Sequence, residues 1–159
     1  MRTRYYGHFH IDETYIKIKG KWHYLYRAVN LSGDTVDFKL SKKRNKKAVL
    51  SFFRKLSHHN GYPTYATIDR SGSNESALKT IEKQLDRPVK IIQRKYSNNM
   101  IEQDHRFIKK RYKAMLGFKT FRTASIILSG IEYMHILHKK QFEVNNQREA
   151  VPVFYELMS

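Results

Sequence analysis

The order in which the apolar pattern changes its period is the feature that most restricts the fold of this chain. The first forty residues are rich in aromatic and β-branched side chains, and turn signals at Gly20 and Gly33 divide them. Such segments, joined by short turns, predict an antiparallel meander of three strands. The predicted strands cover residues 9–19, 22–31 and 35–40.

A helix is predicted directly after this meander. Asn45 stands where a helix cap is expected, because its side chain can accept a hydrogen bond from a free backbone N–H of the first turn. The apolar residues that follow recur at helical spacing, and Gly61 and Pro63 are typical of a helix end.

Short β-rich segments and helices then alternate. We expect a strand at 64–68, a helix capped by Ser73 or Asn74, a strand at 89–92, and helices over 98–116 and 124–140. The order β-β-β-α-β-α-β-α-α indicates an α/β protein with a mixed five-stranded sheet and helices on its faces. This is the element order of the ribonuclease H-like fold. We expect one domain over residues 1–142 and a C-terminal tail, residues 143–159, whose structure the pattern leaves undefined.

The charge balance points to a polyanionic partner. The chain has 31 Lys and Arg residues against 14 Asp and Glu residues, a formal net charge of +17. Nucleic acid is the first candidate to offset this charge, and an anionic membrane surface is the second. The absence of cysteine excludes disulfides, thiolate zinc sites and a cysteine nucleophile. Because no apolar run approaches the ~18 residues of a membrane span, we expect a soluble, cytoplasmic domain.

Three carboxylates stand out in so basic a chain. Asp12 interrupts an apolar strand, Asp69 directly follows another, and Glu102 falls in the first turns of a basic helix. Carboxylate oxygens are the ligands that Mg²⁺ prefers, and two such ions about 3.5–4 Å apart activate an attacking oxygen and stabilise a leaving one. The alternative is a turn or cap role for Asp69 and a favourable helix-dipole contact for Glu102. Asp12 is harder to explain in that way, because a buried carboxylate without a partner is costly.

A competing metal site lies on the first strand. His8, His10 and Asp12 share one side of it, as in zinc hydrolases with an H-x-H-x-D motif, and imidazole suits zinc. The other interpretation places the two histidines at a sheet edge or near DNA. Glu13 points to the opposite sheet face, so the sequence offers Asp12 rather than Glu13 as the ligand on the histidine side.

Two basic segments are the candidate DNA contacts. On the last-but-one helix, Glu102, His105 and Lys109 share a face, because they stand at i, i+3 and i+7. Basic runs in a chain of this charge favour contact with phosphates over a merely solvated loop. The candidate DNA-binding residues are Lys42, Lys43, Arg44, Lys46 and Lys47 before the first helix, and Arg106, Lys109, Lys110, Arg111 and Lys113 along the later one.

An aromatic set alternates along the second strand. Trp22, Tyr24 and Tyr26 stand two residues apart, so they share one face of the predicted sheet. Half-buried packing explains this set more simply than base stacking does.

Ordered motifs across most of the chain resemble a known family. They are similar to the catalytic domain of bacterial insertion-sequence transposases of the D-D-E class, most closely the sixth insertion-sequence family. The most specific motif is Tyr-x-Asn-Asn-x-Ile-Glu-x-Asp-His, over residues 96–105. The others begin at Asp12 (DETYIK), Trp22 (with YLYRA from Tyr24), Thr67 (TID), Gly117 (GFKT) and Gly130 (GIE).

The resemblance implies the chemistry of the site. Asp12, Asp69 and Glu102 correspond to the catalytic, metal-binding triad, and Lys109 to the basic residue that contacts DNA. The family's fold is ribonuclease H-like, and its cofactor is a pair of Mg²⁺ ions, for which we expect Mn²⁺ to substitute. Its reaction is strand cleavage that frees a 3′-hydroxyl, followed by attack of that hydroxyl on target DNA.

The resemblance also bears on partners and extent. The expected partner is double-stranded DNA, both element ends and target, with a homodimer as the expected assembly. Family members carry an N-terminal helix-turn-helix, for which the residues before Asp12 leave no room, so we expect an excised catalytic domain or a truncated gene product. Two alternatives stay open at this point: a nuclease on the same fold, and a non-catalytic DNA-binding remnant.

Overall fold

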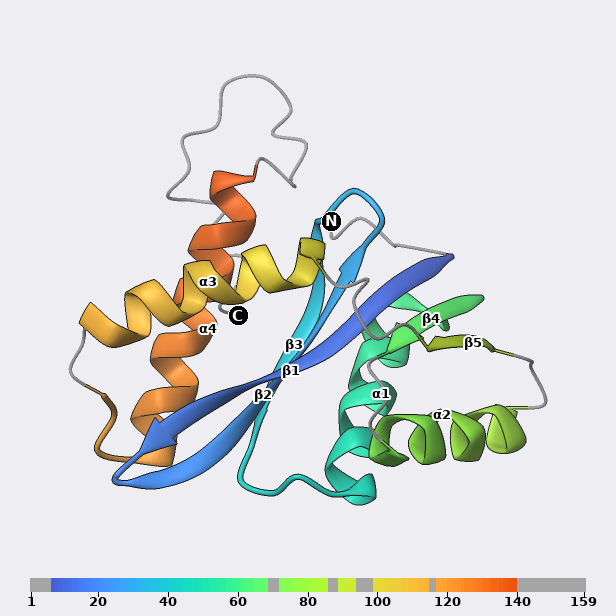
Figure 1. Cartoon of the computed structure of the whole chain (residues 1–159), viewed down its shortest axis with the longest axis horizontal. Coiled ribbons are helices and arrows are strands. Elements are labelled where there is room, and N and C mark those ends of the chain that lie inside the picture. Colours follow the sequence, from blue (N-terminus) through green and yellow to red (C-terminus); the bar gives the residue numbers. More distant parts are fainter. Residues whose placement is uncertain (1–6, 69–71, 86–88, 94–98, 115–116, 140–159) are drawn as a thin grey trace.

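The elements of the computed structural model follow the predicted order (Figure 1). The structure describes residues 7–68, 72–85, 89–93, 99–114 and 117–139. The strands are β1 (His8–Ile18), β2 (Lys21–Asn30), β3 (Thr35–Ser41), β4 (Tyr65–Ile68) and β5 (Lys90–Gln93). The helices are α1 (Lys46–Asn60), α2 (Gly72–Leu85), α3 (Asn99–Ala114) and α4 (Phe121–His138).

The five strands form one mixed sheet in the order β3-β2-β1-β4-β5. β1, β2 and β3 are the predicted antiparallel meander, and β4 and β5 continue the sheet in parallel on the other side of β1. β4 is short, and its pairing with β1 runs only from His8–Tyr65 to Ile11–Ile68. Along the described part of the sheet, β1 therefore has no strand partner on that side from Asp12 to Lys17.

The two faces of the sheet carry separate cores. Successive strand residues point to opposite faces, so Phe9 and Ile11 pack with residues of α1 and α2. Ile16 and Ile18 pack instead with residues of α3 and α4. Each residue of β1 therefore faces either the core with α1 and α2 or the core with α3 and α4, according to its place in the alternation.

The local signals at the first helix are confirmed. Asn45 caps α1, and its Oδ1 accepts the backbone N–H of Ala48 at 2.9 Å. Gly61 ends the helix with φ 80°, a conformation that costs glycine little, and its N–H donates to the carbonyl of Ser57 at 2.9 Å.

The predicted start of the second helix is wrong by two or three residues. α2 begins at Gly72, so Ser73 and Asn74 lie inside its first turn and do not cap it. Several small polar residues stand in a row here, and each of them is a possible N-cap. Helix ends are also less well determined by such local patterns than helix interiors are. No helix among the described residues is long and apolar enough to cross a bilayer.

Candidate active site

Asp12 lies on the sheet face that carries α3 and α4. It is half-buried, and its register partner in β2 is Arg27. Its Oδ1 accepts the backbone N–H of Glu13 at 2.8 Å, which restricts rotation of the carboxylate. A half-buried, oriented carboxylate fits a hard divalent cation in both its chemistry and its accessibility.

Glu13 lies on the opposite face and is engaged there. Its carboxylate forms an ion pair with Arg44, and its side chain is 7% exposed. The Arg44 guanidinium also lies over the Tyr15 ring, 5.7 Å from the centroid. Burial and the nearby Glu13 carboxylate raise the pKa of Tyr26 far above its usual value, so this phenol stays neutral. Glu13 thus stabilises the junction between the sheet and the loop before α1.

Of the other two predicted ligands, Asp69 is not described and Glu102 is described only in its backbone. Asp69 lies outside the described residues, one position after Ile68, which pairs with Ile11 of β1. The backbone of Glu102 belongs to α3, but its side chain, like that of His105, lies outside the described part. Among the described residues, no group of three His, Cys, Asp or Glu side chains converges as a metal site.

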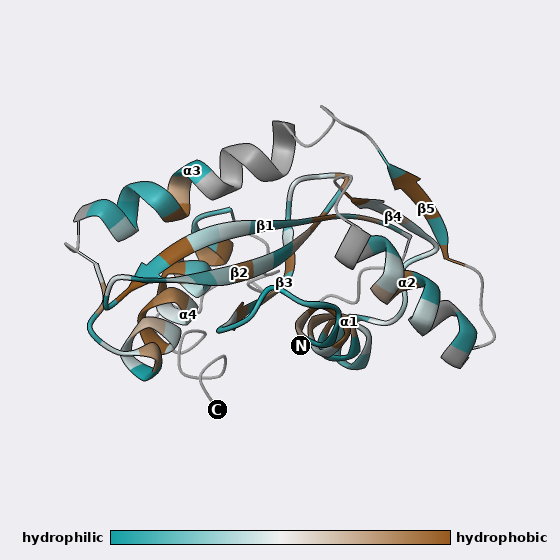
Figure 2. Ribbon diagram, turned by 60° about the horizontal axis from the view of Figure 1, so that its bottom comes forward, coloured by the Kyte–Doolittle hydropathy of each residue, from teal (hydrophilic) through white to brown (hydrophobic). Residues whose placement is uncertain are grey.

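The position of α3 along β1 is set by one tyrosine. The Tyr112 hydroxyl donates to the carbonyl of Lys17 at 2.7 Å and accepts its N–H at 3.1 Å. α3 and β1 run alongside each other in the same direction in both views (Figures 1 and 2). From this anchor, ten residues back to Glu102 cover about 15 Å of helix, and five residues back to Asp12 cover about 16 Å of strand. The backbones of Glu102 and Asp12 therefore stand at similar levels.

The zinc alternative is wrong for the described side chains. The His8 and His10 rings are stacked, with centroids 5.0 Å apart and planes 6° from parallel. His8 Nε2 is hydrogen-bonded to the Thr67 hydroxyl at 2.5 Å. Both histidines and Asp12 are described, and they do not form a metal-binding group. His8 instead connects β1 to β4 through Thr67, and His10 stacks on it.

The predicted DNA-binding residues of α3 form an exposed stripe. Ile108 is buried in the second core and fixes the inner side of the helix. Figure 2 shows that the described part of α3 is mostly hydrophilic. The exposed cations are Arg106, Lys109, Lys110, Arg111 and Lys113.

The basic run that leads into α1 and includes its first two residues is also exposed, but its members differ in their contacts. Lys42 lies over the Phe121 ring at the start of α4, 5.0 Å from the centroid, and Arg44 is paired with Glu13. The charge of Arg44 is thereby partly neutralised within the protein. Lys43, Lys46 and Lys47 complete the run.

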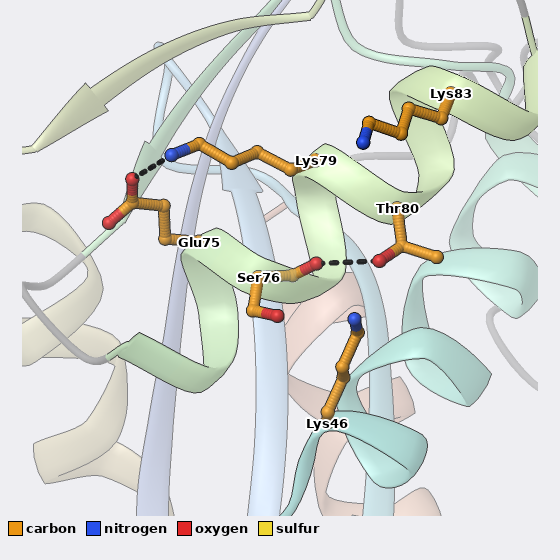
Figure 3. Close-up of a pocket in the computed structure, with 6 residues that line it drawn as sticks. All are labelled: Lys46, Glu75, Ser76, Lys79, Thr80 and Lys83. Carbon is orange, nitrogen blue, oxygen red and sulfur yellow. Dashed lines mark hydrogen bonds and ion pairs between the residues drawn. The ribbon is translucent and has the colours of Figure 1, made fainter.

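Sequence reasoning missed a cluster of lysines between α1 and α2. Lys46 of α1 and Lys79 and Lys83 of α2 line a hollow of about 380 Å³ (Figure 3). Lys79 pairs with Glu75 at 2.6 Å, and Gln93 also donates to that carboxylate; these contacts lower the Glu75 pKa. The signal in the sequence was the i, i+4 spacing of Lys79 and Lys83. Their proximity to Lys46 depends on the packing of two helices.

The comparison with family models decides the family. Residues 7–141 match a transposase family model described as a DDE domain. The chain belongs to this family. Membership of a DDE-domain family implies use of a divalent metal ion.

Two relatives of this DDE domain are named transposases. The chain is 41% identical over 131 residues to the transposase for insertion sequence-like element IS431mec of Staphylococcus aureus strain Mu50. It is equally similar to the transposase for insertion sequence element IS257 in transposon Tn4003, also of Staphylococcus aureus. Each match covers 82% of this chain and 57% of the relative, so the chain spans little more than half the length of these curated relatives.

Solved integrase cores share the fold of this DDE domain. The catalytic core of HTLV-2 integrase in complex with magnesium, dimeric form, matches with a TM-score of 0.56 at 18% identity, covering 69% of this chain and 71% of that one. The catalytic core of BIV integrase matches with a TM-score of 0.57 at 16% identity, covering 89% and 85%. The predicted ribonuclease H-like fold is confirmed.

Proposed function

We propose that this DDE domain is the catalytic domain of a DNA transposase, with Asp12, Asp69 and Glu102 as its metal-binding triad. The observation that carries the proposal is the common level of Asp12 and the Glu102 backbone, on the sheet face that carries α3. The register adds support, because Ile68, the last residue of β4, pairs with Ile11, and Asp69 and Asp12 directly follow these two residues in the sequence.

The triad fits a pair of Mg²⁺ ions by its chemistry. When bound, two such ions supply activation of the attacking oxygen and stabilisation of the leaving one. The role of Asp12 is to hold a fixed negative charge on this face, oriented by the N–H of Glu13. Glu13 is not proposed as a ligand, because its carboxylate is engaged with Arg44 on the other face.

The proposed substrate is double-stranded DNA, held through its phosphates. The α3 stripe supplies cations on the same helix as Glu102, and the exposed lysines at 42, 43, 46 and 47, which lead into α1, supply a second set. We extend the proposed contacts to Lys79 and Lys83, which continue this second set across the hollow beside Lys46. Arg44 contributes less than its neighbours, since Glu13 already balances its charge.

We also propose that the domain acts as a homodimer through α4. Ile126 and Met134 on this helix are more than half exposed. Met134 lines an apolar groove of about 390 Å³ between α3 and α4, together with Ile127 and Ile131. A second copy of the chain is the proposed cover for this apolar surface.

The test is a strand-transfer assay with a pre-cut, labelled DNA end and Mg²⁺ or Mn²⁺. The proposal expects joined products from the wild-type chain and none from Asp12→Asn, Asp69→Asn or Glu102→Gln, each with an unchanged melting temperature in metal-free buffer. Shortened strands without joined products would assign the domain to a nuclease. Metal-independent binding without any cleavage would assign it to a non-catalytic DNA-binding protein.

A further inference from the structure

Exposure of the aromatic residues of β2 rises steadily toward the β1–β2 turn. Tyr26 is buried and stacks on Phe52 of α1, with centroids 5.9 Å apart, and Tyr24 is half-buried. Trp22 is 56% exposed. The expectation of half-buried packing is therefore wrong for Trp22, because the core beneath α1 ends before this residue.

Tyr15 joins these residues from the neighbouring strand. It is 44% exposed and pairs directly with Tyr24, so their side chains share a face. Its ring meets Trp22 edge-on at 6.2 Å and Tyr24 at 5.4 Å. We call Tyr15, Trp22 and Tyr24 the aromatic platform.

Cations flank the aromatic platform on both sides. Lys17, the register partner of Trp22, places its ammonium 5.4 Å from the indole centroid. Arg44 lies over Tyr15 on the other side. Single exposed apolar residues are ordinary, but contiguous exposed rings between two cations match a ligand that has flat rings and negative charge.

The other face of this hairpin end is buried in the second core. Ile16 and Leu25, next to platform residues in the chain, are fully buried in the second core. The end of the hairpin is therefore held to the protein through its opposite side. The aromatic platform is not needed to attach it.

Asp12 and the platform residue Tyr15 both lie on the part of β1 with which β4 does not pair. β4 pairs with β1 only as far as Ile11 in the described sheet. Asp12 and Tyr15 stand three residues apart on opposite faces, about 10 Å along the strand. A DNA strand that contacts both residues has to pass around this edge of β1.

We propose that the aromatic platform binds unpaired DNA bases, with Trp22 and Tyr15 stacking on bases and Lys17 contacting a phosphate. Every base has a π-face, so this contact is tolerant of sequence, and it differs from the phosphate contacts that hold a duplex. The inference rests on the proposed DNA-directed function and adds single-stranded DNA to its substrates.

The test uses the intrinsic fluorescence of Trp22, which is the only tryptophan in the chain. The protein is titrated with a twelve-nucleotide oligo(dT), an abasic oligonucleotide of equal length, and a twelve-base-pair duplex. Stacking predicts strong quenching by oligo(dT) and weak quenching by the abasic strand at matched occupancy, which anisotropy of labelled strands establishes. Equal quenching by both single strands would overturn the proposal, because phosphate contact alone would explain it.

Variants separate stacking from general binding. Trp22→Ala is expected to weaken oligo(dT) binding about tenfold, and Trp22→Phe to keep most of it, since a smaller ring still stacks. Leu31→Ala is the matched control, because it removes a 58%-exposed apolar side chain just beyond the other end of β2. All three variants are expected to bind the duplex like wild type and to keep its melting temperature.

The outcomes also distinguish this inference from the proposed function. If the protein binds the duplex but binds oligo(dT) no better than the abasic strand, the aromatic platform proposal is overturned and the transposase proposal stands. A protein partner is then the occupant to test. If the wild-type chain binds neither the duplex nor single-stranded DNA, the proposed function is overturned as well.

Discussion

Arg27 of β2 and Glu132 of α4, 105 residues apart in the chain, form a fully buried, two-pronged ion pair. Arg27 Nε donates to Oε1 at 2.6 Å and Nη2 donates to Oε2 at 2.9 Å, and neither side chain is exposed. Arg27 is also the register partner of Asp12. The pair therefore ties α4 to the sheet on the face, and at the level, of the proposed catalytic carboxylate.

Breaking this pair from one side is expected to destabilise the fold. Glu132→Ala leaves a buried guanidinium without its carboxylate partner, which costs about 3–5 kcal/mol of unfolding free energy. Replacing both partners, as in Arg27→Met with Glu132→Leu, is expected to recover most of that loss, because no uncompensated charge remains. Urea unfolding measures both. Lys79→Gln is the control, since its ion pair with Glu75 is exposed to solvent and contributes little to stability. Additive losses in the double variant would contradict the interpretation.

Neutralising Asp12 is expected to reduce activity, whereas neutralising Glu13 is expected to reduce stability. Asp12→Asn should reduce metal-dependent cleavage to the level of the metal-free protein and leave stability nearly unchanged, because the amide keeps the shape but loses the charged metal ligand. Glu13→Gln should cost about 1 kcal/mol of stability through its weakened contact with Arg44, and should keep cleavage. Nicking assays measure the cleavage activity of both variants, and denaturant unfolding measures their stability. Loss of activity only in Glu13→Gln would mean that the first ligand is Glu13.

Lys109→Ala is expected to weaken DNA processing more than stability. The residue is exposed on α3, where substitutions usually change unfolding free energy by no more than about 0.5 kcal/mol. Arg54→Ala, an equally exposed basic residue of α1, serves as the control and should leave processing unchanged. Cleavage rates and melting temperatures of both variants show whether Lys109 acts in DNA processing or in stability. A large fall in melting temperature for Lys109→Ala would show that this lysine is structural.

The lysines of the α1–α2 hollow are expected to contribute to the salt dependence of duplex binding. Each phosphate contact adds about −0.9 to the log–log slope of affinity against salt, so changing Lys46, Lys79 and Lys83 to Gln should flatten it by up to about 2.7. The same loss of charge at Arg54, Lys90 and Lys119 is the control. Titrations use terminal-repeat and scrambled duplexes, and we expect no preference between them. An unchanged slope would place the DNA elsewhere.

Much of the fold was predictable because its signals are local. The cap at Asn45, the helix end at Gly61 and the alternation along β1 each depend on residues within a few positions of one another. Asp12 was found in the same way, as a charge in an apolar strand, and its place opposite Glu13 follows from the strand period alone. The assignments of Asp12, Asp69 and Glu102 to the triad remain predictions.

Other features depend on contacts between segments far apart in the chain, which no local pattern contains. Trp22 and Tyr26 occupy equivalent places in one alternation, yet one is exposed and the other buried, because the core beneath α1 covers only part of β2. Arg44 belongs to a uniformly basic run, and only the approach of that run to β1 gives it Glu13 as a partner. The sequence by itself determined the elements, their order and the face of each strand residue. The tertiary structure alone decided which of those faces are covered and which charges meet, because burial and ion pairing are properties of packed neighbours.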